Sequence, residues 1–312
     1  LFDLDEFALY EIERTLRDKS TVELVPILGS VTDARLVKRV FEQNGIDTVF
    51  HAAAYKHVPM VELNMLSGIA NNVFGTLTVA EAAFDAKVEY FVLISSDKAV
   101  RPANVMGATK RWSEIIVRSF ANRPRELAAK QRFCAVRFGN VIGSQGSVVP
   151  LFMEQIAKGG PVTLTDENMT RYFMSIREAA ELIIQAASLS ENGDVFLLDM
   201  GEPVAIRDLA ENMIRFSGLS LKDASHPAGD IEIKVVGSRP GEKMFEELFY
   251  DATHVEPTTH RRIMRGKRRH WNYGDVCEAL TSLRLAIDSG DEATANALLF
   301  SAVQQVKRKP AA

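Results

Sequence analysis

Short apolar runs alternate along the chain with longer amphipathic segments. The runs are rich in β-forming residues and occur at 23–28, 48–50, 90–94, 132–138 and 195–200. The segments between them repeat apolar residues at helical spacing, most clearly over 65–86. Short apolar strands that alternate with helices are typical of a parallel sheet covered on both faces. The pattern therefore predicts an α/β fold with a doubly wound parallel sheet, whose last strand we expect at 195–200.

The second half of the chain has shorter elements. We expect helices at 149–157, 178–188 and 206–218, strands at 161–165 and 231–236, and two further helices within 275–306. The helix at 206–218 ends on a glycine, which is a common helix terminator. The second half of the chain thus also mixes strands with helices.

Composition excludes several classes of protein. The 312 residues are 46% hydrophobic and 25% charged, as in an ordinary globular protein, and can form one large domain or two interlocked ones. The net charge of −4 gives no reason to expect a nucleic-acid partner. Cys134 and Cys277 are the only cysteines, and we expect free thiols in a reducing cytoplasm. No apolar run reaches the roughly 20 residues that span a bilayer, and we expect no signal peptide.

Candidate chemistry gathers where the apolar run 90–94 stops. Ser95, Ser96, Asp97 and Lys98 follow it directly, so hydroxyl, carboxylate and amine groups stand at the carboxyl end of a strand. In open α/β sheets this is where ligands bind. A helix then begins after Pro102, and it carries Met106 and Lys110 on one face because they are four residues apart.

The stretch 91–111 resembles the active site of the extended short-chain dehydrogenase/reductases, in which a Ser or Thr at a strand end works with Tyr-x-x-x-Lys. Here Met106 stands in place of the Tyr. The runs Ser-Asp-Lys-Ala-Val and Asn-Val-Met-Gly-Ala-Thr-Lys-Arg resemble, more narrowly, the nucleotide-sugar 4,6-dehydratases of bacterial polysaccharide biosynthesis (the CapD-like group). The resemblance extends to about residue 255. It implies a Rossmann-type fold, NAD or NADP as cofactor, and UDP-N-acetylglucosamine as substrate.

The beginning of the chain resembles the second strand of a Rossmann unit. The opening LFDLDEF is typical of a strand end that leads into a helix, with Asp3 at the strand tip. An acidic residue there binds the adenosine ribose, which favours NAD over NADP. Alternatively, Asp3 is only a helix N-cap. Because Leu1 is not a Met, we expect a trimmed chain whose first strand and Gly-rich turn lie upstream, and any membrane contact would come only through such a region.

The resemblance implies a set of binding residues. For the cofactor they are Asp3, Ser30, Val31, Ala52, Ala53, Lys56, Asn72, Ser95, Lys110 and Phe138. For the UDP-sugar they are Lys56, Asn140, Val148, Arg171, Met174, Arg239 and Glu242. Ser30 departs from the family, which often has Asp at this position. No metal is expected, because His51 and His57 have no third ligand at a matching spacing.

The resemblance also divides the chain. We expect a dinucleotide-binding domain at 1–145, to which 170–200 returns, and a smaller α/β substrate-binding domain formed by 146–169 and 201–255. The remaining 256–312 is expected to be a helical extension. Its basic run 261–270 is typical of a solvated face. Apart from the UDP-sugar, the partner that we expect is a second copy of the chain, in a homo-oligomer.

The implied reaction needs acid–base groups. Oxidation at C4 of the sugar makes the C5 proton acidic, so that water can leave across C5 and C6. We expect Asp97 to act as acid toward C6 and base toward the C4 hydroxyl, and Lys98 to act as C5 base, which requires a lowered pKa. Met106 cannot carry a proton, Lys110 would hold the nicotinamide ribose, and Ser95 or Ser96 would bind the oxygen at C4. The alternatives are a 4-epimerase on the same scaffold and a catalytically inactive sugar-nucleotide-binding module.

Overall fold

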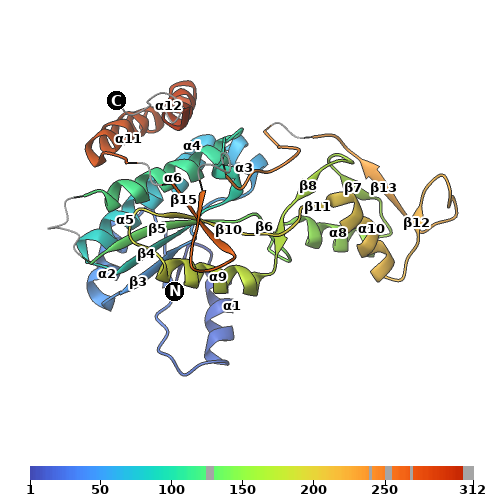
Figure 1. The fold of residues 1–312 in the computed structure, drawn as a ribbon, viewed down its shortest axis with the longest axis horizontal. Coiled ribbons are helices and arrows are strands. Elements are labelled where there is room, and N and C mark those ends of the chain that lie inside the picture. Colours follow the sequence, from blue (N-terminus) through green and yellow to red (C-terminus); the bar gives the residue numbers. More distant parts are fainter. Residues whose placement is uncertain (124–129, 239–240, 250–254, 268–269, 305–312) are drawn as a thin grey trace.

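The protein is described by a computed structural model that covers residues 1–123, 130–238, 241–249, 255–267 and 270–304. Its centre is a six-stranded sheet with the strand order β14-β15-β10-β5-β4-β3 (Figure 1). The strands β10, β5, β4 and β3 run parallel, whereas β15 pairs antiparallel with β10, and β14 pairs antiparallel with β15 at the edge. The strands are β3 (Thr48–His51), β4 (Tyr90–Ile94), β5 (Arg132–Arg137), β10 (Val195–Leu198), β14 (Val255–Pro257) and β15 (Ile263–Gly266). The predicted α/β class with a mostly parallel sheet is confirmed.

The unbroken apolar character of the central strands has a direct cause. Side chains along a strand point alternately to the two faces of the sheet. Phe91 and Leu93 of β4 belong to the larger hydrophobic cluster, whereas Val92 between them belongs to a second cluster on the opposite face. In β5, Phe133 and Cys134 divide in the same way. Both faces of the sheet are therefore buried.

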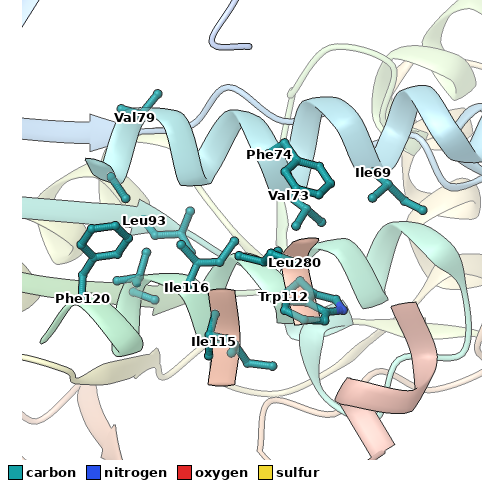
Figure 2. Close-up of a cluster of buried hydrophobic side chains, with 14 of the residues drawn as sticks. Ile69, Val73, Phe74, Val79, Leu93, Trp112, Ile115, Ile116, Phe120 and Leu280 are labelled. Atoms are coloured by element: carbon teal, nitrogen blue, oxygen red, sulfur yellow. The ribbon is translucent and has the colours of Figure 1, made fainter. Parts of the chain in front are cut away.

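Helices form layers on the two faces. The larger cluster lies under α2 (Ala34–Asn44), α4 (Met65–Ile69), α5 (Gly75–Asp85) and α6 (Val105–Ala121), and under the hairpin of α11 (Tyr273–Asp288) and α12 (Glu292–Gln304). The other face is covered by α9 (Ile176–Ser188). Figure 2 shows Trp112, Ile115 and Ile116 of α6 in the larger cluster together with Leu280 of α11. Because α6 lies between the sheet and this hairpin, almost every side chain on it is buried.

The segment 65–86 is not the single helix that its periodicity predicts. It consists of α4, a π-helical turn η1 (Ala70–Phe74) and α5. A π turn accommodates one extra residue, and such turns are frequent at functional sites. Here the turn carries Asn71 and Asn72, both buried. The local widening places amide side chains on the inner surface of an otherwise apolar helix.

A smaller part lies beyond the central sheet, on the right of Figure 1. It is built from α8 (Val148–Ala157), α10 (Ile206–Phe216) and the sheet of β7 (Val162–Leu164), β12 (Leu221–Lys222) and β13 (Ile231–Val235). Its own core includes Phe152, Leu164 and Ile214. Two short ladders join the parts, β6 (Asn140–Val141) with β9 (Phe173–Met174) and β8 (Thr170–Arg171) with β11 (Val204–Ala205).

The N-terminal strands form a separate pair. Strand β1 (Phe2–Asp3) lies parallel to β2 (Ile27–Leu28), with α1 (Glu6–Arg17) between them in sequence. Across from this pair lies β3, and residues of all three strands line a hollow of about 820 Å³. In the described ranges β1 and β3 each have a partner on one side only. The hollow thus separates two unpaired strand edges.

Four expectations about the fold were wrong. The main sheet does not end with β10, because β15 and β14 follow it antiparallel. For the same reason 256–312 is not helical throughout, and part of the basic run forms β15, where the side chain of Ile263 is buried. The expected strand 23–28 is reduced to β2. The N-cap of α1 is Asp5 rather than Asp3, since the Asp5 carboxylate accepts from Ala8 N at 3.0 Å.

The α11–α12 hairpin should contribute strongly to stability. Leu299 of α12 is fully buried, whereas Leu285 of α11 is 66% exposed. We expect Leu299→Ala to lower the free energy of unfolding by about 2–5 kcal/mol, because it leaves a cavity against α6. Leu285→Ala, the control, should change it by no more than about 0.5 kcal/mol. Urea unfolding measures both, and equal effects would contradict this packing.

Candidate active site

Asp97 is the most deeply placed acidic group at the end of β4. The chain leaves the strand into the short 3₁₀ turn η2 (Asp97–Ala99), and Asp97 N donates to Phe138 O at 3.1 Å. The side chain has no solvent exposure, and its Oδ1 accepts from Ser96 Oγ at 2.8 Å and from Lys98 Nζ at 2.9 Å. Among the described residues, none supplies a hydrogen bond to Oδ2. Oδ1 of Asp97 is thus held in place by two donors, while Oδ2 has no donor among the described residues.

Lys98, whose side chain is 23% exposed, forms an ion pair with the buried Asp97. Its Nζ also lies 3.5 Å from Asn140 Oδ1 and 3.7 Å from Glu246 Oε1. Burial alone would lower the pKa of this amine, but the carboxylates of Asp97 and Glu246 outweigh burial and raise the pKa above its ordinary value. The lowered pKa that we expected for a C5 base is therefore not what the structure shows. In this arrangement Lys98 is an ammonium ion.

Glu246 is a member of this cluster that the sequence did not reveal. It lies in the segment 241–247, which has no regular secondary structure, and its side chain is buried against Lys98. Burial raises the pKa of its carboxyl, and the negative charge of Asp97 adds to the effect. The motif Arg-Pro-Gly-Glu-Lys predicted Glu242 as the site residue of this segment. Glu246 stands outside that motif, and only contacts formed in the folded chain bring it to the end of β4.

The segment 241–247 is held against the end of β4 by hydrogen bonds. Arg171 donates from Nη1 to Met244 O at 2.9 Å and from Nη2 to Lys243 O at 2.7 Å. Lys243 Nζ donates to Val100 O at 2.9 Å, and Asn104 Nδ2 donates to Gly241 O at 2.8 Å. Arg171, which we expected to bind the UDP-sugar, uses these donors to hold the segment.

A second charged cluster lies beneath the site. Glu114 of α6 accepts from Arg137 Nε and Nη2, both at 2.6 Å, and from Arg111 Nη1 at 2.8 Å. Ser95 Oγ also donates to it, at 2.7 Å. Although burial opposes ionisation, the two guanidinium groups and Ser95 lower the pKa of Glu114 to about 2. The Ser95 hydroxyl therefore points into α6, and of the two candidate serines Ser96 is the one beside Asp97.

Lys110 and Met106 occupy the helix face that their spacing predicts. Lys110 Nζ donates to Ile94 O at 2.8 Å, and burial lowers the pKa of its amine to about 8, against the opposing charge of Glu114. Met106 is 2% exposed and packs in the larger hydrophobic cluster. Next to them, burial and Lys110 lower the pKa of His51 to about 3, so this imidazole is neutral.

Asn72 joins the turn after β3 to the active-site helix. Its Oδ1 accepts from Tyr55 N at 2.8 Å, and its Nδ2 donates to Tyr55 O at 3.0 Å and to Thr109 Oγ1 at 2.9 Å. The π turn η1 presents this amide, as described above. These hydrogen bonds connect the turn after β3 to α6, and the expected contact of Asn72 with the cofactor stays a prediction.

Most of the other cofactor candidates lie around the hollow. Asp3, Val31, Ala52 and Ala53 line it. Ser30 lies beside them in sequence and bonds Thr32 Oγ1 at 2.8 Å. These residues stand at the carboxyl ends of β1, β2 and β3. Lys56 is exposed, and Phe138 is half-buried just after β5.

The substrate candidates divide into three groups. Asn140 lies at the Asp97–Lys98 pair, and Glu242 is half-buried on the segment 241–247. Val148 at the start of α8 packs on the core of the smaller part, whereas Met174 is buried in the second cluster of the main sheet. Arg239 lies outside the described residues.

Comparison with known proteins identifies the family. The sequence profile of the family described as "polysaccharide biosynthesis protein" matches residues 1–268. The chain belongs to this family. The capsular polysaccharide biosynthesis protein CapD of Staphylococcus aureus is 46% identical over 269 residues, which are 85% of this chain and 43% of CapD. The chain spans less than half the length of this family member.

Solved structures confirm the fold of the present chain. The X-ray structure of Pen from Bacillus thuringiensis is 32% identical with a TM-score of 0.75, and the match covers 87% of this chain and 80% of Pen. A UDP-glucose 4-epimerase from Thermus thermophilus, in complex with NAD, has a TM-score of 0.60 at 21% identity, over 77% of this chain and 86% of the epimerase. Within the described ranges, every helix is too short or too polar to cross a membrane.

Replacing Glu114 by glutamine should destabilise the protein in a pH-dependent way. At neutral pH we expect a loss of about 3–5 kcal/mol in the free energy of unfolding, because Arg111 and Arg137 would stay buried without the carboxylate. The native pKa of about 2 lies below the ordinary value of 4.5. The stabilisation is therefore complete above pH 4.5 and is lost as pH falls toward 2.

Urea unfolding at several pH values tests this linkage. The difference between the wild type and Glu114→Gln should narrow below about pH 4.5. Glu181→Gln is the matched control, because Glu181 forms an exposed ion pair with Arg177. This substitution should change the free energy of unfolding by about 0.5 kcal/mol at most. A difference for Glu114→Gln that is constant at every pH would contradict the assignment.

Proposed function

We propose that the protein is a nucleotide-sugar 4,6-dehydratase that acts on UDP-N-acetylglucosamine in surface polysaccharide biosynthesis. The observation that carries the proposal is the ion pair of the buried Asp97 with the half-buried Lys98 at the end of β4, combined with a methionine where related reductases have their tyrosine. The pair supplies both an acid and a base where ligands of α/β sheets bind. Membership of the polysaccharide biosynthesis family and the match to CapD support the pathway.

The proposed cofactor is NAD or NADP. The residues at its adenosine end fit, since Asp3, Val31, Ala52 and Ala53 line one hollow at the carboxyl ends of three strands. At the nicotinamide end, Lys110 lies beneath Ile94 and would hold the ribose. The related fold of the epimerase that binds NAD supports this proposal. The chemistry that the cofactor supplies when bound is temporary removal of hydride from C4 of the sugar and its return at C6.

The side chains of the site would then move two protons. The Asp97 carboxylate takes the proton of the C4 hydroxyl, and the C4 ketone that results makes the C5 proton acidic. Lys98 removes the C5 proton as a neutral amine, and Asp97 gives its proton to the C6 hydroxyl, which leaves as water. Ser96 orients Asp97 through its hydrogen bond to Oδ1. Asn140, whose Oδ1 lies 3.5 Å from Lys98 Nζ, and Glu242 would contact the sugar nucleotide.

A UDP-hexose 4-epimerase is the second candidate. The fold shared with the Thermus thermophilus epimerase favours it. Epimerisation needs a group that removes the C4 hydroxyl proton and returns it, which the tyrosine of such enzymes does. Met106 is buried in the hydrophobic core and has no such proton. The dehydratase therefore accounts for more of the site. A catalytically inactive binding module would not explain an acid–base pair built on a fully buried carboxylate.

The proposal includes expectations about the whole protein. A location in the cytoplasm would give the enzyme access to nucleotide sugars and to NAD. A homo-oligomer also stays a prediction.

Substitutions at the pair test the reaction. We expect Asp97→Asn and Lys98→Met each to reduce loss of water from UDP-N-acetylglucosamine by at least about a hundredfold, because each removes a proton carrier. Binding of UDP should persist in both variants. The assay uses the protein at its natural length and follows the product by mass spectrometry.

Lys38→Met provides the control, since Lys38 is exposed on α2 and should leave turnover unchanged. Full turnover in Asp97→Asn or Lys98→Met would remove that residue from the scheme. A product of unchanged mass that is inverted at C4 would replace the dehydratase with the epimerase.

A further inference from the structure

Two buried carboxylates face Lys98 from different parts of the molecule. Asp97 lies on its own turn at 2.9 Å, and Glu246 approaches from the segment 241–247 at 3.7 Å. The side chain of Glu246 is only 4% exposed. Its Oε2 and the Oδ2 of Asp97 both lack a hydrogen-bond partner within the described part of the chain. Two buried acceptor oxygens without donors are costly unless a proton or a ligand completes them.

The groups around Glu246 make its carboxylate a better proton acceptor. Lys98 and Asp97 face it from η2, Arg171 from β8, and Lys243 from its own segment. Burial is the largest influence and raises the pKa of Glu246; Asp97 raises it further, and the three cations oppose this. Glu246 is thus a better proton acceptor than an ordinary surface glutamate. The same surroundings raise the pKa of Lys98.

The proposed reaction places conflicting demands on Lys98 and Asp97. Asp97 has to be ionised at the start, because it takes the C4 hydroxyl proton. Lys98 has to be neutral, because it takes the C5 proton. An ionised Asp97 at 2.9 Å keeps Lys98 protonated. During the reaction Asp97 takes up the C4 hydroxyl proton, so it cannot also take the ammonium proton of Lys98. A third group is therefore needed to hold that proton.

We propose that Glu246 is this group: it takes the ammonium proton of Lys98 and so produces the amine that removes the C5 proton. The inference rests on the dehydratase function proposed above. One N–H bond of Lys98 breaks and an O–H bond forms on Glu246; the amine then forms a new N–H bond with the proton from C5. After Lys98 returns a proton to C5, Glu246 gives its proton back. Glu246 acts only through Lys98, so it is a positioning residue.

The position of Glu246 connects this transfer to substrate binding. A gap of 3.7 Å is longer than the distance of about 3 Å at which a proton passes directly. Glu246 belongs to the segment that also carries Glu242, a candidate contact to the sugar nucleotide. Closure of this segment by less than about 1 Å on a bound substrate would bring the two groups into hydrogen-bond contact. Lys98 would then become a base only when substrate is present.

The pH profile of Glu246→Gln tests the proposal. In the wild type the proton moves within the Lys98–Glu246 pair, so kcat/KM for water loss should be nearly flat between about pH 6 and 8. Glutamine cannot accept the proton, and Lys98 has to release it to solvent. The kcat/KM of Glu246→Gln should therefore rise about tenfold per pH unit over that range. Glu246→Asp should restore the flat profile at a lower rate.

Glu247→Gln is the control on the same segment. Glu247 pairs with the half-exposed Arg101, and this variant should keep the flat profile. If Glu246→Gln lowers kcat/KM by the same factor at every pH, or leaves it unchanged, Glu246 has no role in the proton transfer and the proposal is overturned. If the wild type forms no dehydrated product, the proposed function itself fails.

A measurement that needs no turnover separates these two failures. The carbon-13 Cε resonance of Lys98, assigned by comparison with Lys98→Arg, reports the ionisation of its amine. Loss of the Glu246 charge should lower the pKa of Lys98, so the titration should shift to lower pH in Glu246→Gln. A shift would support the coupling even if the substrate were a different sugar, whereas an unshifted titration would overturn it.

Discussion

The site depends on one buried carboxylate, that of Glu114. It receives two guanidinium groups and a hydroxyl from α6, β5 and the end of β4, so a single charge connects the helix to two adjacent strands. Removing such a charge from water is costly, and only the dense set of donors around it makes the burial favourable. The consequence is that the turn bearing Asp97 begins from a fixed point. This fixed point orients the side chains of Asp97 and Lys98.

The sequence was most informative where local pattern and tertiary environment agree. The run 90–94 was predicted to the residue, because both faces of β4 are buried and the polar residues begin where the strand ends. The spacing of Met106 and Lys110 was equally reliable, since it follows from helix geometry alone. By contrast, 65–86 has the same periodicity whether or not it contains a π turn. Only the structure shows the extra residue of the π turn, which places Asn72 in hydrogen-bond contact with Tyr55 and Thr109.

Contacts between distant residues account for what the sequence could not show. Ser95 stands in a motif position, but the direction of its hydroxyl is decided by Glu114 on the following helix. Arg171 has the donors of a phosphate-binding residue, and the folded chain directs them to carbonyl groups. Glu246 has no local signature at all. Its importance comes from a raised lysine pKa, which is a property of three side chains together rather than of any motif.

The hollow between β1 and β3 has a consequence beyond cofactor binding. The edges of these strands that face it offer backbone N–H and C=O groups without a partner in the described chain. Exposed edges of this kind are templates onto which other extended chains can add. Phe50 of β3 and Leu28 of β2, each about half exposed, add apolar surface nearby. An extended segment seated in this opening would pair with both edges at once and join β1 and β2 to the central sheet.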